Sequence, residues 1–481
     1  MTDTTTQPPI INWPGKTGPK SVNWGGKALL VCALAFLMTI PGMFVWALIK
    51  DRSNRSEGVV AEVSKLQGGS QQVLGPLLIA PYSIPTKKDA DPITGWYVVS
   101  PETGAATVKV KADTLRRGIF DVPVYRATAD IDATFAPRAA APNLPAGAVV
   151  DWNGALIVVG FSDLRGAKSD VAATLTTPQG ATKLAFSPAS GVDLGRTAVS
   201  DGVDMPRGVG SDGRFGLVAA PAGPLIASAQ GGALKASLVF TGAQRLSVMP
   251  FAKSTRVAIS GDWSAPSFDG GFLPEKRELS DSGFTANWSV PFMARGLVGE
   301  GSSGSALSLS DLGGQDLGVT FTRINNPYQN VMRALKYAVM FVGLVFLTFF
   351  VFEALSGARL HPAQYVLIGL AQMVFYLLLL SLSEYIGFDA GFALAAVATV
   401  LLIGLYAGAA FKARRYRIQA MVVFTIVYGL IYLLMRLEDF ALLAGSIAAF
   451  VGLTAAMWLT RNIDWYGGKA EAQAAPATQP Q

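Results

Sequence analysis

Long apolar runs lie at the two ends of this chain, and a segment in which apolar and polar residues alternate separates them. The first run covers residues 28–49. Five more crowd the C-terminal third, at 337–355, 362–382, 389–411, 418–435 and 440–459. A helix needs about 20 apolar residues to cross about 30 Å of hydrocarbon. The pattern therefore predicts an α-helical membrane part with one N-terminal and five C-terminal transmembrane helices, and a kink at Pro41-Gly42 in the first helix.

Basic residues flank these runs unevenly. With six spans and a cytoplasmic N-terminus, the inside segments hold Lys16, Lys20, Lys27, Arg359, Lys412, Arg414, Arg415, Arg417, Arg461 and Lys469. The short outside loops hold only Arg436. Because cytoplasmic loops carry the excess of Lys and Arg, we expect both termini inside and residues 50–333 outside.

The first run and the two tails need separate interpretation. A cleavable signal peptide has an apolar core of about 7–15 residues. The 28–49 run is longer, so we interpret it as an uncleaved signal anchor. The tails, residues 1–27 and 460–481, include stretches rich in Thr and Pro or in Ala, Pro and Gln, and we predict that both are disordered.

Residues 50–333 have a β-type pattern. Apolar and polar side chains alternate over 124–135 and 234–241, and further candidate strands lie at 155–161, 184–186, 256–259, 285–290 and 317–322. Such runs between turns are typical of antiparallel strands with one wet face. Val59, Val63 and Leu66 instead predict a short helical stalk that ends at Gly68-Gly69. We expect a large all-β, sandwich-like domain, as either two lobes or one elaborated sheet fold.

The composition narrows the chemistry. The chain is 51% hydrophobic and 15% charged, and its only cysteine and histidine are Cys32 and His361. An intramolecular disulfide, a Cys/His zinc site and a Ser-His-Asp triad in residues 50–333 are thereby excluded, and we expect no cofactor. Ile10 stands where a Walker A motif ending at Gly15-Lys16-Thr17 needs glycine. The net charge of +6 reflects topology, and we expect no nucleic-acid partner.

Two groups of polar residues are candidate functional features. At 100° per residue, Tyr365, Gln372, Tyr376 and Ser383 fall within about 60° of one another on the third apolar run. Such an intramembrane stripe either lines a path or hydrogen-bonds packed helices, and packing is the commoner role.

The second group consists of four charged residues at the predicted outer edge: Glu384, Arg436, Glu438 and Asp439. We expect this interface cluster to pair internally or to contact the outer domain, and we favour this structural role over a catalytic one.

The C-terminal third also carries recognisable motifs. They are Arg333-Ala334-Leu335-Lys336-Tyr337-Ala338, Leu347-Thr348-Phe349-Phe350, His361-Pro362-Ala363-Gln364-Tyr365, Ser381-Leu382-Ser383-Glu384 and Thr460-Arg461-Asn462-Ile463-Asp464-Trp465. The outer segment adds Gly75-Pro76-Leu77-Leu78-Ile79-Ala80-Pro81-Tyr82. Together these motifs resemble the CreD-type inner-membrane proteins of Gram-negative bacteria, over nearly the whole chain apart from the tails. The sequence departs from the family at Tyr385, where a histidine is expected.

The resemblance implies a bacterial inner-membrane location, a role in cell-envelope integrity and the envelope-stress response, and no established catalytic residues. We therefore expect a non-enzymatic envelope-maintenance protein whose partners are the lipid bilayer and either another envelope protein or an envelope precursor. An alternative is a transporter, or transport accessory, for a lipid or envelope precursor. A third hypothesis is a periplasmic hydrolase that uses carboxylates such as Asp163 or Asp262 without histidine.

Overall fold

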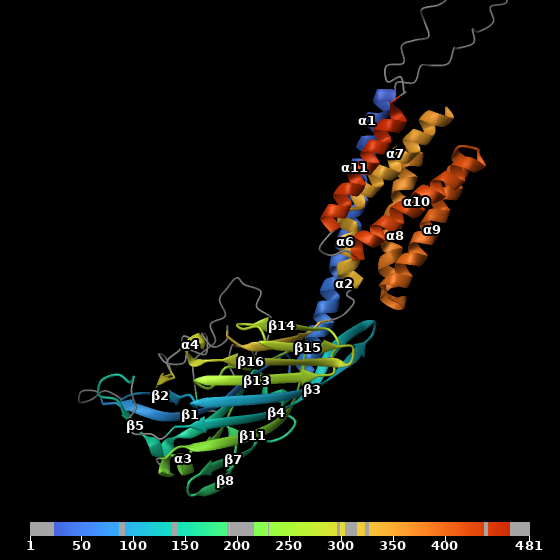
Figure 1. Ribbon diagram of the computed structural model, residues 1–481. Helices are drawn as coiled ribbons and strands as arrows, with labels where there is room; N and C mark the ends of the chain where they lie inside the picture. The colour runs from blue at the N-terminus through green and yellow to red at the C-terminus, as the bar shows by residue number, and fades with distance from the viewer. Residues whose placement is uncertain are drawn as a thin grey trace, which may run out of the picture. The chain divides into compact units, whose positions relative to one another are not determined.

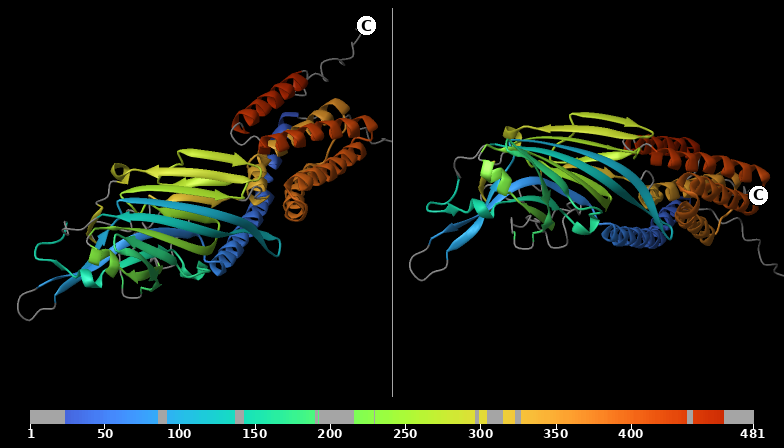
Figure 2. Two further views of the ribbon diagram at one scale, coloured as in Figure 1. Left: turned by 60° about the horizontal axis from the view of Figure 1, so that its bottom comes forward. Right: turned by 90° about the horizontal axis from the view of Figure 1, so that it is seen from below.

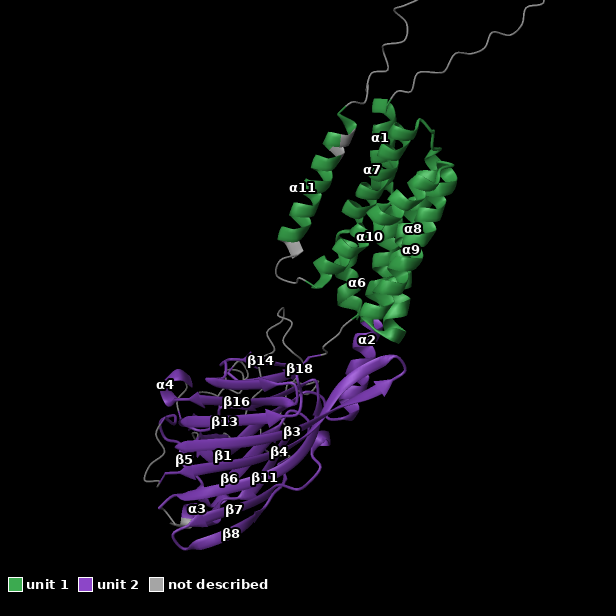
Figure 3. Ribbon diagram, turned by 45° about the vertical axis from the view of Figure 1, so that its right-hand side comes forward, with its two compact units in different colours: residues 1–53, 326–481 green, residues 54–325 purple. Residues whose placement is uncertain are grey.

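The structure, a computed structural model, describes residues 24–85, 92–136, 143–189, 192, 216–228, 230–295, 299–303, 315–322, 327–436 and 441–461. The chain divides into two compact units, residues 1–53 with 326–481 and residues 54–325 (Figure 3). The first unit holds apolar helices and the second holds the sheets, which confirms a membrane protein with a large β domain. Of the tails predicted to be disordered, 1–27 and 460–481, residues 1–23 and 462–481 lie outside the described residues. Trp24–Lys27 and Thr460 are instead helical, in α1 and α11.

The first unit is a bundle of helices (Figure 1). Its helices are α1 (Trp24–Leu37), α2 (Thr39–Leu66, which continues into the second unit), α6 (Pro327–Lys336), α7 (Ala338–Ser356), α8 (Pro362–Ile386), α9 (Phe388–Ala410), α10 (Arg414–Arg436) and α11 (Ala441–Thr460). Among the described residues, five helical stretches are long and apolar enough to cross a membrane: Trp24–Leu66, α7, α8, α9 and α10. In α11 the apolar helix is shorter, Leu443–Ala455.

The N-terminal helical stretch is interrupted at Met38, between α1 and α2. Pro41 has no backbone N–H, so the carbonyl of Leu37, four residues earlier, loses its helical donor, and the proline ring crowds that carbonyl. The helix therefore stops at Leu37 and restarts with Pro41 in its first turn. Pro41 thus explains an interruption three residues before the predicted position of the kink.

The second unit contains two β-sheets (Figure 1). The ten-stranded sheet has the order β14-β18-β12-β1-β6-β10-β9, with β2, β5 and β17 attached beside it. Its strands are β1 (Gln71–Ile84), β2 (Ile93–Val99), β5 (Val149–Val150), β6 (Leu156–Phe161), β9 (Ser187–Pro188), β10 (Gly216–Pro221), β12 (Arg245–Met249), β14 (Pro266–Gly270), β17 (Glu300–Ser302) and β18 (Leu317–Phe321).

The eight-stranded sheet has the order β15-β16-β13-β3-β4-β11-β7-β8. Its strands are β3 (Thr103–Arg117), β4 (Phe120–Phe135), β7 (Ala172–Thr177), β8 (Gly180–Ala185), β11 (Gly232–Ala243), β13 (Ser254–Gly261), β15 (Lys276–Ser280) and β16 (Gly283–Val290). Short helices α3 (Gly223–Ser228) and α4 (Phe292–Arg295) and two single 3-10 turns, at Trp152–Gly154 and Leu164–Gly166, connect strands. Most pairings are antiparallel, and each sheet holds one parallel pair, β1 with β12 and β3 with β13.

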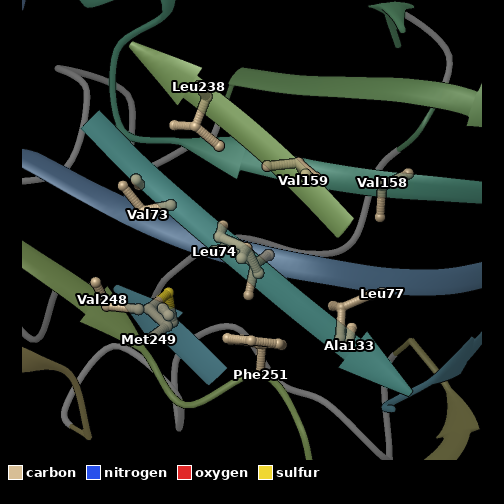
Figure 4. Close-up of a cluster of buried hydrophobic side chains, with 14 of the residues drawn as sticks. Val73, Leu74, Leu77, Ala133, Val158, Val159, Leu238, Val248, Met249 and Phe251 are labelled. Carbon is tan, nitrogen blue, oxygen red and sulfur yellow. The ribbon is translucent and has the colours of Figure 1, made fainter. Parts of the chain in front are cut away.

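One hydrophobic core joins the two sheets, so the domain is a single sandwich rather than two lobes. Figure 4 shows side chains of β1, β6 and β12 in one sheet together with those of β4 and β11 in the other. Phe251 lies in this core, where a Cβ on Gly75 or Gly104 would overlap its ring. Glycine at these two positions therefore lets the aromatic ring pack directly on the backbone of both sheets.

The end of α2 forms the predicted stalk and packs on the sandwich. Val63 is buried against Val122, Val124 and Ala243. These contacts lie beside the long hairpin of β3 and β4, whose tip extends beyond the neighbouring strands in Figure 2. The helix ends before Gly68 and Gly69, which have φ angles of +92° and +68°. This left-handed backbone favours glycine and turns the chain into β1.

Leu74 tests whether the shared core supports the β domain, because its side chain is fully buried. Leu74→Ala should lower the free energy of unfolding of a fragment comprising residues 54–325 by about 2–5 kcal/mol, through lost burial and a residual cavity. Urea denaturation followed by circular dichroism measures this change.

Leu279→Ala, at a position 56% exposed on β15, is the matched control and should change stability little. Equal effects of the two substitutions would contradict the assignment of Leu74 to the core.

Candidate functional site

The two strands nearest the membrane helices along the chain lie close together in the sheet. β12 pairs with β1 on one side, where Gln71 faces Leu246, and with β18 on the other, where Thr320 faces Arg245. The first residues of β1 and the last residues of β18 therefore lie at the same end of the sheet, separated by one strand. At about 4.8 Å per strand, the chain enters and leaves the sandwich about 10 Å apart.

A buried ion-pair cluster holds this end of the sheet, and we call it the Arg245 cluster: Arg245, Asp269, Asp316 and Gln72. The Arg245 guanidinium lies 2.7 Å from a carboxylate oxygen of Asp316 and 2.7 Å from one of Asp269. Gln72 Nε2 donates to Asp316 Oδ2 over 3.0 Å. Burial alone would lower the pKa of Arg245, but the hydrogen bonds and charges of Asp316 and Asp269 outweigh burial and raise it. The cluster thus links β1, β12 and β14 with the residue that precedes β18.

Tyr125 connects the same end to the second sheet. Its hydroxyl donates to the carbonyl of Arg245 over 2.8 Å and accepts from the backbone N–H of Gln71 over 3.3 Å. Burial of the ring raises the pKa of the Tyr125 phenol well above its ordinary value, so this hydroxyl stays a donor. Because Tyr125 lies on β4, both sheets contribute to the point where the chain enters and leaves.

A second buried arginine lies at the end of α4. Arg295 is 2% exposed, and its Nη1 donates to the carbonyl of Ala252. Its Nε is buried without a hydrogen-bond partner among the described residues. Burial lowers the pKa of Arg295 to about 10, which leaves it a cation at neutral pH.

In the helical bundle, Glu353 on α7 is completely buried and accepts three hydrogen bonds. The donors are Lys27 on α1, the backbone N–H of Leu360 at 3.1 Å and the hydroxyl of Tyr365 at 3.1 Å. Lys27 also donates to the carbonyl of Leu360 over 3.0 Å. The Lys27–Glu353 pair therefore fixes α1 to the α7–α8 connection.

The predicted stripe lies on the buried face of α8. Tyr365, Gln372, Tyr376 and Ser383 are each between 1% and 4% exposed. Ser383 donates within the helix, to the carbonyl of Leu380. Gln372 differs from these residues, because its Oε1 is buried without a hydrogen-bond partner among the described residues. Tyr365 joins one end of the stripe to Glu353, and Glu384 follows Ser383 at the other end.

The predicted interface cluster divides between two sets of partners. Glu384 accepts from the hydroxyl of Tyr328 over 2.9 Å, and Arg52 Nη1 lies 3.9 Å from its Oε2. Arg436 lies 2.6 Å from Asp389, and both side chains are 55% exposed. Glu438 and Asp439 lie outside the described residues. The described contacts therefore give Glu384 and Arg436 different partners.

The other candidate groups make structural contacts. His361 caps α8: its Nδ1 accepts from the N–H of Ala363, and Gln364 returns a bond to the N–H of His361. Asp163 accepts from the backbone and side chain of Arg165, and Asp262 accepts from the N–H of Ala112 over 2.6 Å. Across the described ranges, no group of three or more His, Cys, Asp or Glu side chains could hold a metal ion.

Sequence reasoning missed the Arg245 cluster because its members lie far apart along the chain and belong to no motif. Arg245 follows a sharp turn at Gln244, whose φ is +65°, and nothing in the alternation marks its side chain as buried. Glu353, by contrast, lies near the predicted end of an apolar run. Its position was evident, but its burial and its pairing with Lys27 were not.

The Lys27–Glu353 pair provides a test of bundle stability. Lys27→Met should destabilise the detergent-solubilised protein by about 3–5 kcal/mol, because it leaves a buried carboxylate unpaired. Adding Glu353→Gln should recover part of this loss. Thermal unfolding of the four proteins in this double-mutant cycle measures the coupling.

The exposed pair Arg436 and Asp389 is the matched control, and Arg436→Gln should shift the unfolding temperature little. Strictly additive losses for Lys27→Met and Glu353→Gln would show that the two side chains are not coupled.

Comparison with known proteins identifies the family. The family model described as "Inner membrane protein CreD" matches residues 23–466. Among curated proteins, "Inner membrane protein CreD" of Escherichia coli (strain K12) is 30% identical over 446 residues, which cover 89% of this chain and 91% of that protein. The matched region includes both the helices that carry the Lys27–Glu353 pair and the sandwich that carries the Arg245 cluster. The chain therefore belongs to the CreD family of inner-membrane proteins.

Proposed function

We propose that this inner-membrane protein maintains cell-envelope integrity without catalysing a reaction. In this proposal the β domain lies in the periplasm, both termini lie in the cytoplasm, and the domain acts as a firmly tethered structural element. The partner it would support is another envelope protein or an envelope precursor at the membrane surface.

The observation that carries the proposal is the joining of both chain connections at one end of the sandwich. β1 and β18 flank β12, and the Arg245 cluster and Tyr125 tie these strands to each other and to the second sheet. Force or thermal motion transmitted through either connection therefore acts on one cross-linked region. Such an arrangement suits a domain whose role is to stay attached and folded.

The charged residues also favour a structural role. Catalytic acids and bases are commonly held with perturbed pKa values in a cleft. Burial alone would raise the pKa of Asp163, but its hydrogen bonds from Arg165 outweigh burial and lower the pKa, so Asp163 stays a carboxylate that caps the turn Leu164–Gly166. Asp262 accepts a hydrogen bond from the backbone N–H of Ala112 on β3, which is a contact between two segments of the sandwich.

The basic residues support the proposed orientation. If six spans alternate across the membrane, one side holds Lys27, Arg359 and Lys412, which lie at helix ends or in connections. The other side holds Arg436 and the β domain. The excess of basic residues favours the cytoplasm for the first side. Reporter fusions after Phe135 and Phe388 should report the periplasm, and fusions after Leu360 and Arg417 the cytoplasm. A periplasmic signal after Arg417 would contradict this topology.

The functional test uses a bacterial strain without its own copy of this gene. Loss of the protein should increase leakage of a periplasmic reporter enzyme under detergent or β-lactam stress, and the wild-type protein should restore retention. The double variant Asp163→Asn/Asp262→Asn should restore it equally. Arg245→Met should restore it poorly, because Asp316 and Asp269 lose their shared cation.

Immunoblots of the membrane fraction control for protein level. A double variant that is present at the wild-type level but fails to restore retention would overturn the non-enzymatic proposal in favour of carboxylate chemistry.

One observation favours the transport alternative: the Oε1 of Gln372, within the stripe of α8, is buried without a hydrogen-bond partner in the part of the chain that the structure describes. A path for a polar group needs such an available acceptor inside the bundle, whereas tight packing does not. Under our proposal Gln372→Leu restores retention like the wild type. Gly404→Leu is the comparison for packing, because a Cβ at Gly404 would already overlap Met421. If Gln372→Leu is as stable as the wild type but fails in the leakage assay, the transport alternative is preferred.

A further inference from the structure

The bundle has an apolar groove along one face of α2. The groove has a volume of about 510 Å³ and runs from Ala35 to Lys50, with the junction of α6 and α7 as its other wall. Thr39, Met43, Trp46 and Lys50 follow the i, i+4, i+7, i+11 spacing of one helical face. Because all the lining residues belong to the helical unit, the groove is a feature of the bundle itself.

The lining is rich in methionine. Met38 and Met43 from the α1–α2 stretch, Met332 from α6 and Met373 from α8 all border the groove. Methionine side chains are unbranched and flexible, so they adapt to chains of varied shape. A Cβ on Gly369 of α8 would overlap Met38, so α8 packs closely beside this part of the groove.

Two lysines border the groove. Lys50 on α2 and Lys336 at the end of α6 both line it, and both side chains are exposed. Within the part of the chain that the structure describes, neither ammonium group is in an ion pair. This distinguishes them from Lys27, Arg52 and Arg436 of the same bundle, which face carboxylates.

The groove is long enough to span the apolar part of one leaflet. The fifteen residue-to-residue rises from Ala35 to Lys50 correspond to about 22 Å of helix, which exceeds the roughly 15 Å of half the hydrocarbon thickness. With Lys50 at the head-group level, the apolar part of the groove reaches through the leaflet. Trp46 lies one helical turn before Lys50, so the same placement puts it near the membrane–water interface, where tryptophan is enriched in membrane proteins.

We propose that this groove binds an anionic phospholipid of the bilayer, with an acyl chain along α2 and the phosphate group at Lys50 and Lys336. Charge complementarity selects the occupant, since basic pockets between membrane helices bind acidic lipid head groups. A purely apolar partner helix would leave both ammonium groups without a counter-charge. This lipid site goes beyond the proposed function and depends only on the groove.

Trp46 provides the readout, because it lines the groove and brominated acyl chains quench tryptophan fluorescence on contact. The full-length protein is reconstituted in phosphatidylcholine vesicles that carry a minor fraction of brominated lipid, either phosphatidylglycerol or phosphatidylcholine. The difference between wild type and Trp46→Phe isolates the Trp46 emission. We expect stronger quenching by the brominated phosphatidylglycerol.

Lysine variants test the head-group contact. Lys50→Gln/Lys336→Gln should raise the fraction of brominated phosphatidylglycerol needed for half-maximal quenching by about five-fold for each lysine removed. Lys109→Gln/Lys111→Gln makes the same charge change at exposed positions of β3 and should behave like the wild type.

Equal quenching by the two brominated lipids, or an unchanged half-maximal fraction in the Lys50/Lys336 variant, would overturn the proposal. Absence of Trp46 quenching by either lipid would also overturn it, because protein would then cover the groove.

Discussion

A charge removed from water must be neutralised where it lies, and in this protein that requirement joins segments that the sequence keeps far apart. Lys27 and Glu353 are 326 residues apart, and Gln72 and Asp316 are 244 residues apart. Neither Glu353 nor Asp316 would be stable as an isolated buried carboxylate. Each therefore fixes the relative position of its partners, the first within the helical bundle and the second within the sandwich.

The two buried pairs act at different levels of the fold. In the bundle, Glu353 binds Lys27, Leu360 and Tyr365 together, so that α1, α7 and α8 share one electrostatic centre. In the sandwich, the contacts of Arg245 and Tyr125 hold together β1 and β18, the strands through which the chain enters and leaves. Hydrophobic burial stabilises the sandwich and van der Waals packing stabilises the helical bundle, but neither is strongly directional. The ion pairs and hydrogen bonds supply the directional contacts that select one arrangement of the strands and helices.

The sequence predicted those helices and strands whose buried residues follow a recognisable pattern of apolar and polar positions. Uniform apolar runs predicted α7 to α10, and alternation predicted strands such as β4, β11 and β16 because each has one wet face. β1 was not identified: Gln71–Ala80 is buried on both faces, so its pattern contains no alternation. Pro41 predicted a kink. Because proline cannot donate to the carbonyl four residues earlier and its ring crowds that carbonyl, the helix ends at Leu37.

The candidate site was less predictable than the fold for the same reason. The stripe on α8 follows from helical spacing alone, and its four residues are all buried. The Arg245 cluster depends on strand order and on one parallel pairing, which no short stretch of sequence encodes.

The arrangement of charge in the bundle separates structural side chains from those available to a ligand. Lys27 and Arg436 lie against carboxylates of the chain itself, so their charges are already paired. Lys50 and Lys336 are instead exposed beside an apolar groove, where a molecule that carries both an anionic group and an apolar chain can pair with them and fill the groove. A membrane supplies such a molecule in every anionic lipid, with its charge at the head-group level and its chain below. Charge pairing thus stabilises the fold internally where water is excluded, and at this groove it favours an anionic lipid as the occupant that we propose.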